Sequence, residues 1–107
     1  MSGDTISHHA PLWVWHGEGP ASWHFITIDG DAAMQLAALE AMQRLETGMR
    51  RGFGSVKVSA QIGDSEWTTS VFPHKSSQGW LLPVKAAIRK AEGIVEGDEV
   101  NVRLQVL

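Results

Sequence analysis

The five histidines have the most versatile chemistry in this sequence, because imidazole binds metals and exchanges protons near neutral pH. His8 and His9 are adjacent, so on an extended strand their side chains point to opposite faces. His16 and His24 flank a turn, but the expected hairpin pairing sets His24 against Trp15 and not against His16. We therefore expect no metal site and no cofactor.

Combinations of a nucleophile and a base are also incomplete. Ser70 and His74 are close in sequence, but no Gly-x-Ser-x-Gly turn surrounds Ser70. Two carboxylates occur in Asp64-Ser65-Glu66, where turn residues of this type are common. Cysteine is absent, which excludes thiol nucleophiles and disulfides. The sequence therefore favours a non-catalytic protein, with a cofactor-independent acid–base enzyme as one alternative.

Aromatic and cationic side chains give a better candidate for a binding site. The chain has five tryptophans and no tyrosine, which fits either core packing or a cavity lined by indoles. Lys85 and Arg89 are four residues apart, on one face of an expected helix, where they could receive an anion or simply contact solvent. We predict a ligand site with indole walls and a few polar groups, formed by Trp67, Ser70, His74, Lys75, Trp80, Lys85 and Arg89.

Length and composition indicate one ordinary globular domain. The chain has 107 residues, of which 43% are hydrophobic and 20% charged, with a formal net charge of -3. We expect a flexible tail over residues 1–10 and a single domain over residues 11–107. No apolar run is long enough to cross a membrane, and the first ten residues do not resemble a secretory signal, so we expect a cytoplasmic protein.

The first half of the chain predicts a hairpin followed by a helix. Alternating and β-branched residues predict strands over 11–16 and 22–28, joined by the glycine- and proline-containing segment 17–21. We expect Trp15 to lie near His24 across this hairpin. Good helix formers predict a helix over 32–47. Its expected buried stripe consists of Ala38, Met42, Leu45 and Met49.

The second half predicts four strands and a short helix. Alternation predicts strands over 53–62, 66–72, 79–82 and 99–107, with a polar loop over 73–78. A helix is expected over 84–92, with Pro83 at its first position and Gly93 just after its end.

The expected order is therefore β-β-α-β-β-β-α-β, a mainly β fold. Two helices cannot cover both faces of an open parallel sheet, so the pattern favours a small β-barrel capped by two helices. Each half contains a strand led by an aromatic residue, Trp23 or Trp80, then a helix, a glycine turn and an alternating strand. This repeat predicts an internal pseudo-two-fold; coincidence is the alternative, because strand–helix–strand units are common.

Several motifs resemble a known family. They are Gly19-Pro20-Ala21-Ser22-Trp23-His24-Phe25, the segment from Gly63-Asp64-Ser65 to Phe72-Pro73, Gly79-Trp80-Leu81-Leu82-Pro83-Val84-Lys85, Ile88-Arg89-Lys90-Ala91, Gly93 and Gly97-Asp98. In this order they resemble DUF1905, a bacterial and archaeal family of unknown function, from Leu12 to the end of the chain. The resemblance implies a small double-split β-barrel. The sequence departs from the family at Asp29, where the family usually has proline, which affects only the start of the first helix.

The segment from Leu82-Pro83 to Gly97-Asp98 also looks like half of an AbrB/MazE-type swapped-hairpin regulator. This likeness concerns the fold and carries no function with it. We expect a module that binds a small ligand, for which an anion is one candidate, or a protein partner, as a monomer or weak homodimer. A nucleic-acid-binding regulator is the other alternative, which the negative net charge opposes.

Overall fold

The computed structural model describes residues 5–17, 19–20, 22–47 and 54–107. The elements are β1 (Thr5–His16), β2 (Ser22–Ile28), α1 (Gly30–Thr47), β3 (Val56–Ile62), β4 (Ser65–His74), the 3-10 turn η1 (Lys75–Ser77), β5 (Gly79–Pro83), α2 (Ala86–Glu92) and β6 (Glu99–Val106). This order confirms the predicted sequence of strands and helices. None of the helices in these ranges has the length and apolar composition that crossing a membrane requires.

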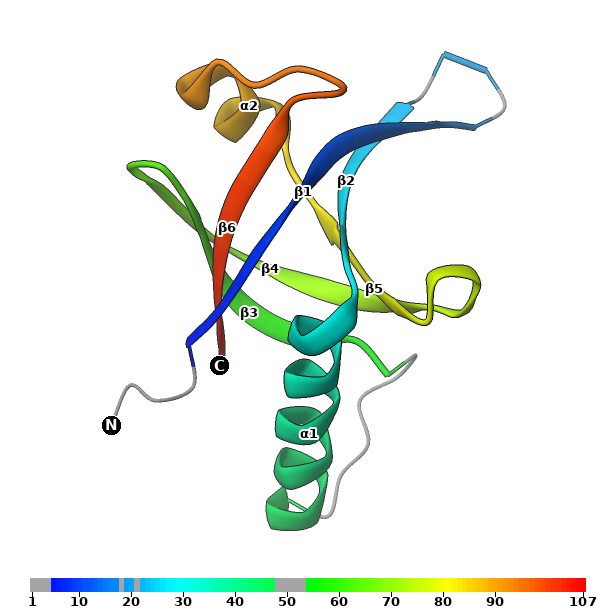
Figure 1. Ribbon diagram of the computed structural model, residues 1–107, viewed down its shortest axis with the longest axis vertical. Coiled ribbons are helices and arrows are strands. Elements are labelled where there is room, and N and C mark those ends of the chain that lie inside the picture. Colours follow the sequence, from blue (N-terminus) through cyan, green and yellow to red (C-terminus); the bar gives the residue numbers. More distant parts are fainter. Residues whose placement is uncertain (1–4, 18, 21, 48–53) are drawn as a thin grey trace.

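The six strands form a closed antiparallel barrel in the order β1-β2-β5-β4-β3-β6 (Figure 1). Alternating residues of β3 and β6 point into it, as the sequence pattern predicted. Those that are buried include Val56, Val58, Ala60, Val102 and Leu104. Closure of the sheet lets a chain of this size bury a continuous apolar core.

β1 and β4 each pair with two different neighbours along their length. Residues 5–11 of β1 pair with β6, and residues 12–16 pair with β2. Residues 65–71 of β4 pair with β3, and residues 72–74 pair with β5. Each change of partner opens the barrel between two strands. We call these openings the β1–β2 split, where residues 5–11 leave β2, and the β4–β5 split, where residues 65–71 leave β5.

The strand order supports the predicted pseudo-two-fold. Exchanging β1 with β4, β2 with β5 and β3 with β6 leaves the order around the barrel unchanged. Trp23 and Trp80, however, are not equivalent: Trp23 is 55% exposed and Trp80 only 8%. The reason is the register, which pairs the inward-facing Ile26 and Leu82, so that Trp80 shares their face and Trp23 takes the opposite one.

Two predictions about the first strands are wrong. Thr5 to Ala10 are not a flexible tail, because they pair with β6 and bury Ile6 in the core; residues 1–4 lie outside the described part. Trp15 lies opposite Trp23, not His24. This register places Leu12 opposite Ile26, both buried, whereas a slip of one residue would turn one of them outward.

The predicted buried stripe of α1 is also wrong. Ala38 is exposed, and so are Met42 and Leu45, at 54% and 86%; Met49 lies outside the described residues. The buried residues are Ala32, Ala33 and Leu36. They lie in the first turns of α1, which contact the barrel. Leu39 still packs against the core, and the end of the helix extends away from the barrel (Figure 1).

Several element ends also differ from the expectation. β4 continues through Pro73 and His74, because they pair with β5. Pro83 ends β5 instead of starting a helix, and the Val84 N–H extends the pairing by donating to the His24 carbonyl at 2.9 Å. α2 therefore begins only at Ala86. β3 begins at Val56, and the expected first residue, Phe53, lies outside the described part.

The β3–β4 hairpin holds α2 against the barrel. Its two-residue loop begins with Gly63 at a φ of 56°, in the left-handed region. Ser65 donates a hydrogen bond to Glu92 in the last turn of α2, at 2.5 Å. The Glu92 carboxylate lies directly over the Gly63 backbone, where a Cβ atom would meet it.

We predict that Gly63→Ala destabilises the fold more than Gly93→Ala. Both glycines have a positive φ, so each substitution should lower the free energy of unfolding by about 1–2 kcal/mol. At Gly63 the new methyl group must also displace Glu92 and break its bond with Ser65, which adds about 1 kcal/mol. A Cβ at Gly93 meets no atom. Urea denaturation measures both, and equal losses would contradict the tie between hairpin and helix.

Candidate functional site

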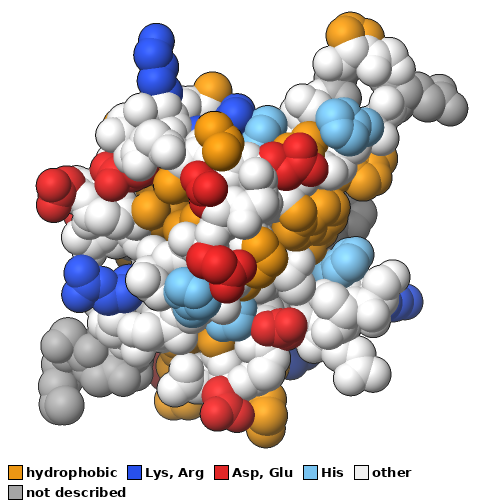
Figure 2. Space-filling model, turned by 45° about the horizontal axis from the view of Figure 1, so that its top comes forward, with side chains coloured by type: hydrophobic (Ala, Val, Ile, Leu, Met, Phe, Trp, Pro, Cys, Tyr) orange, Lys and Arg blue, Asp and Glu red, His pale blue; other side chains and the backbone are white. Residues whose placement is uncertain are grey.

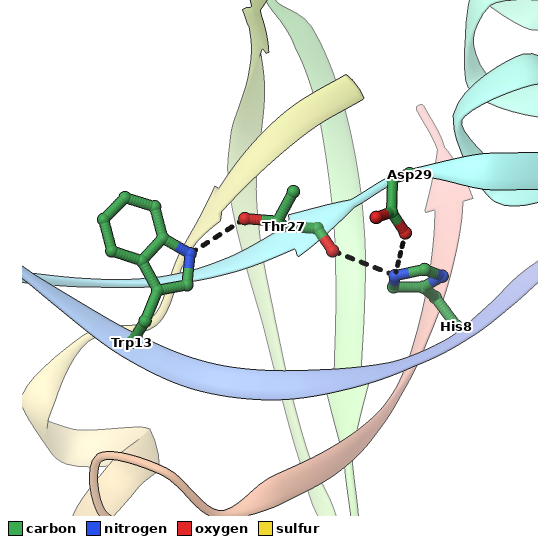
Figure 3. Close-up of polar contacts among 4 residues, drawn as sticks. All are labelled: His8, Trp13, Thr27 and Asp29. Carbon is green, nitrogen blue, oxygen red and sulfur yellow. Dashed lines mark hydrogen bonds and ion pairs between the residues drawn. The ribbon is translucent and has the colours of Figure 1, made fainter. Parts of the chain in front are cut away.

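The two splits of the barrel are related by its strand order but are filled differently. In the β1–β2 split, His8 crosses from β1 to the end of β2 (Figure 3). Its Nε2 donates to the Thr27 carbonyl at 2.9 Å and lies 3.4 Å from Asp29 Oδ1. The Trp13 indole N–H donates to Thr27 Oγ1 at 2.8 Å. Side chains of the protein thus bridge this split directly.

The β4–β5 split contains a cavity of about 200 Å³. It lies between the part of β4 that has left β5, the segment that leads from β5 into α2, and the start of β2. It is lined by Ser22, Trp23, His24, Trp67, Thr68, Thr69, Pro83, Val84, Lys85 and Arg89. Hydroxyl groups, two cations and an imidazole therefore share a small space with indole walls, which is the composition of a ligand pocket.

His24 and Arg89 form the central contact of this cavity. The Arg89 Nη1 lies 3.2 Å from His24 Nε2, and its Nε donates to the Val84 carbonyl at 3.2 Å. A guanidinium only donates hydrogen bonds, so Nε2 of His24 must accept, and the ring proton then resides on Nδ1. That Nδ1 is buried and has no hydrogen-bond partner among the residues that the structure describes. A buried donor without an acceptor costs about 1–3 kcal/mol.

The same contacts keep His24 neutral. Burial lowers the pKa of His24 below its ordinary value of 6.5, and the positive charge of Arg89 lowers it further. Glu96 opposes this shift and His16 adds to it weakly. Near neutral pH the cavity is therefore lined by a permanent cation, Arg89, and by a neutral imidazole whose Nδ1–H is buried and unpaired among the described residues.

Three of the seven predicted site residues meet at this cavity. Trp67 forms a wall and is only 7% exposed, and Lys85 and Arg89 supply the positive charge. The prediction that Lys85 lies on the same helix as Arg89 is wrong. Lys85 is the residue that precedes α2. The two cations nevertheless line one space, because the segment from β5 to α2 runs beside β2.

The other four predicted residues lie elsewhere. His74, Lys75 and Trp80 line a separate cavity of about 530 Å³ beside α1, at the opposite end of β5. His74 Nδ1 contacts the Ser77 hydroxyl at 2.9 Å, and Trp80 donates to the Ala33 carbonyl at 3.2 Å, which fastens α1 to the barrel. Ser70 lies opposite Lys57, on the face of β4 away from Trp67.

The sequence pattern did not single out His24 as a residue of this cavity. His24 was weighed only as a metal ligand, and the wrong hairpin register placed it beside Trp15. The useful signal was the alternation of β2, because His24 shares a face with the apolar Ile26 and Ile28. A histidine at the end of an inward-facing row is a candidate for a site at the end of the barrel.

The remaining histidines lie apart from one another or contact other polar groups of the described residues. His9 contacts Asn101 Oδ1 at 2.5 Å and Glu99 Oε1 at 3.0 Å on the exposed face of β1 and β6. In the described part of the chain, no three His, Cys, Asp or Glu residues lie close enough to hold a metal ion. Figure 2 shows one face on which acidic side chains lie near the middle and Lys and Arg towards the edges. This face does not form the basic surface that nucleic acid requires.

Comparison with known proteins agrees with the architecture. A model of the family described as a domain of unknown function, DUF1905, matches residues 9–104. The chain belongs to the DUF1905 family. No curated protein matches this DUF1905 chain, so the family membership itself brings no activity, substrate or partner.

We predict that His24 makes the stability depend on pH. Its pKa in the folded protein lies below the unfolded value of about 6.5, so below that pH the unfolded chain binds more protons. The free energy of unfolding should therefore fall as the pH drops from about 7 to about 5. The variant His24→Gln should lack the decrease in the free energy of unfolding that comes from His24, as measured by urea denaturation. The control variant His16→Gln, which changes an exposed histidine, should retain this decrease. Parallel profiles for wild type and His24→Gln would contradict the assignment.

Proposed function

We propose that this DUF1905 protein is a non-catalytic binding module that takes a small anionic ligand in the β4–β5 split. The observation that carries the proposal is the buried Nδ1–H of His24, which has no acceptor among the described residues, in a cavity that the Arg89 cation also lines. A ligand oxygen would supply that acceptor. It would also supply the negative charge that faces Arg89.

The charges favour an anion over a neutral ligand. Arg89 uses its Nε–H and one Nη1–H on protein partners, so three of its five N–H donors remain. Lys85 adds a second cation at the same cavity. Hydrogen bonds to charged groups contribute about 1.5–3 kcal/mol each, roughly twice the contribution of neutral ones. Carboxylate and phosphate match the planar donor arrangement of arginine.

The cavity limits the size of the anionic group. A volume of about 200 Å³ holds a carboxylate or phosphate group with a few water molecules, each of which takes about 30 Å³ in the liquid. The hydroxyl groups of Ser22, Thr68 and Thr69 can donate to further oxygens of the ligand. The indoles of Trp23 and Trp67 would exclude water from the contact and so strengthen it.

The two alternatives have less support. An acid–base enzyme needs a base that is free to take a proton from the substrate, whereas the basic nitrogen of His24, Nε2, is occupied by its contact with Arg89. A nucleic-acid-binding regulator would need several exposed cations on one surface, whereas Arg89 is directed towards His24 and Val84.

Inorganic phosphate tests the proposal. We expect calorimetric titration at neutral pH to show one site with a Kd at or below about 1 mM, equivalent to 4.1 kcal/mol. Arg89→Gln should weaken binding at least about tenfold, because it removes the charge and two or more donors. Arg103→Gln is the matched control, since Arg103 lies on the polar outer surface of β3, β4 and β6, next to Glu66 and Ser59.

Two results would contradict the proposal. One is the absence of a heat signal with both phosphate and acetate at about ten times the expected Kd. The other is equal weakening by Arg89→Gln and Arg103→Gln, which would indicate that only the net charge matters. A nanomolar, salt-sensitive complex with duplex DNA would instead support the regulator.

A further inference from the structure

A second feature of the surface is an apolar groove on the outer face of β1, β2, β5 and β4. It has a volume of about 500 Å³, within the range of small-molecule sites. Three of its aromatic side chains are strongly exposed: Trp15 at 51%, Trp23 at 55% and Phe72 at 41%. Single exposed apolar side chains are normal on a protein surface, but a contiguous exposed apolar patch marks a binding surface.

The strand register makes this groove continuous. Trp15 lies opposite Trp23, Phe25 opposite Pro83, and Leu81 opposite Phe72. These side chains all belong to the outward-facing rows, so they form one apolar band across the four strands. The core does not need this band, because the inward-facing rows already fill the barrel.

The groove adjoins the anion cavity. Trp23 and Pro83 line both spaces, so the groove and the β4–β5 split lie on either side of the same two residues. The cationic end of this combined surface is Arg89 and Lys85, and its other end is Phe72. One surface thus offers an apolar area next to a small cationic cavity, and charge complementarity at that cavity determines which end of a ligand enters it.

We propose that the ligand is an amphipathic anion, with an aromatic ring in the groove and its carboxylate or phosphate group at Arg89. This inference rests on the proposed function and specifies its ligand class. The ring would stack against Trp23 and Phe72, and the anionic group would accept from His24 Nδ1 and Arg89. A purely apolar ligand would leave the hydrogen-bond donors of the cavity unpaired. Inorganic phosphate would leave the apolar side chains of the groove exposed to water.

The test compares inorganic phosphate with 2-naphthyl phosphate by calorimetric titration. We expect the naphthyl ester to bind at least about tenfold more tightly, because its ring loses contact with water in the groove. Phe72→Ser should remove most of this gain and leave the Kd of inorganic phosphate unchanged. Met34→Ser is the matched control, because Met34 is also exposed, at 71%, but lies on α1 outside the groove. Arg89→Gln should weaken both ligands.

The outcomes separate this inference from the proposed function. If phosphate binds at Arg89 but the naphthyl ester binds no more tightly, or Phe72→Ser does not affect it, the inference is wrong and the anion site stands. If the ester binds equally well to wild type and Arg89→Gln, the anion site is wrong. If sedimentation shows a dimer that Phe72→Ser dissociates, a second copy covers the groove and the inference is overturned. Thermal unfolding of each variant confirms that it is folded.

Discussion

The barrel depends on two strands, β1 and β4, each of which must pair with two different neighbours. A single sheet of six short strands would expose two edges, whereas the change of partner along β1 and β4 closes the sheet upon itself. The change has a structural consequence, because residues 5–11 and 65–71 must move away from β2 and β5. Each departure opens the barrel at one end, beside the start of a helix. The backbone therefore provides two related openings before any side chain is considered.

The side chains make these openings different. At the β1–β2 split, His8 reaches the Thr27 carbonyl and Asp29, so protein groups satisfy one another (Figure 3). At the β4–β5 split, Arg89 satisfies one nitrogen of His24 and leaves the other without an acceptor among the described residues. Buried polar groups are normally paired, and an exception calls for an explanation. In our account the explanation is a ligand, and the exposed aromatic face beside the cavity determines which ligand.

The sequence predicted the order of strands and helices along the chain, the alternating rows of β3 and β6 and the glycine after α2, because these features depend on local periodicity and backbone conformation. It could not identify the inner face of β4, since both rows of that strand contain bulky apolar residues, and Ser70 belongs to the outer one. It also could not distinguish the contacted from the exposed part of α1, where Ala38 and Leu45 have the spacing of a buried stripe. The contact between His24 and Arg89 joins residues 65 positions apart, and it depends on the register of β2 against both β1 and β5. The predicted hairpin register was wrong by one residue and placed His24 beside Trp15, so the contact between His24 and Arg89 could not be predicted.

The tautomer of His24 is the most direct test of this account. Long-range proton–nitrogen correlation NMR on the nitrogen-labelled protein distinguishes the two ring nitrogens and shows which one carries the proton. Without added anion, at a pH of about 7.5, we predict a neutral ring with its proton on Nδ1, since Arg89 must donate to Nε2. A ring with its proton on Nε2 would contradict the account, because Arg89 would then face another donor and Nδ1 would no longer require an acceptor.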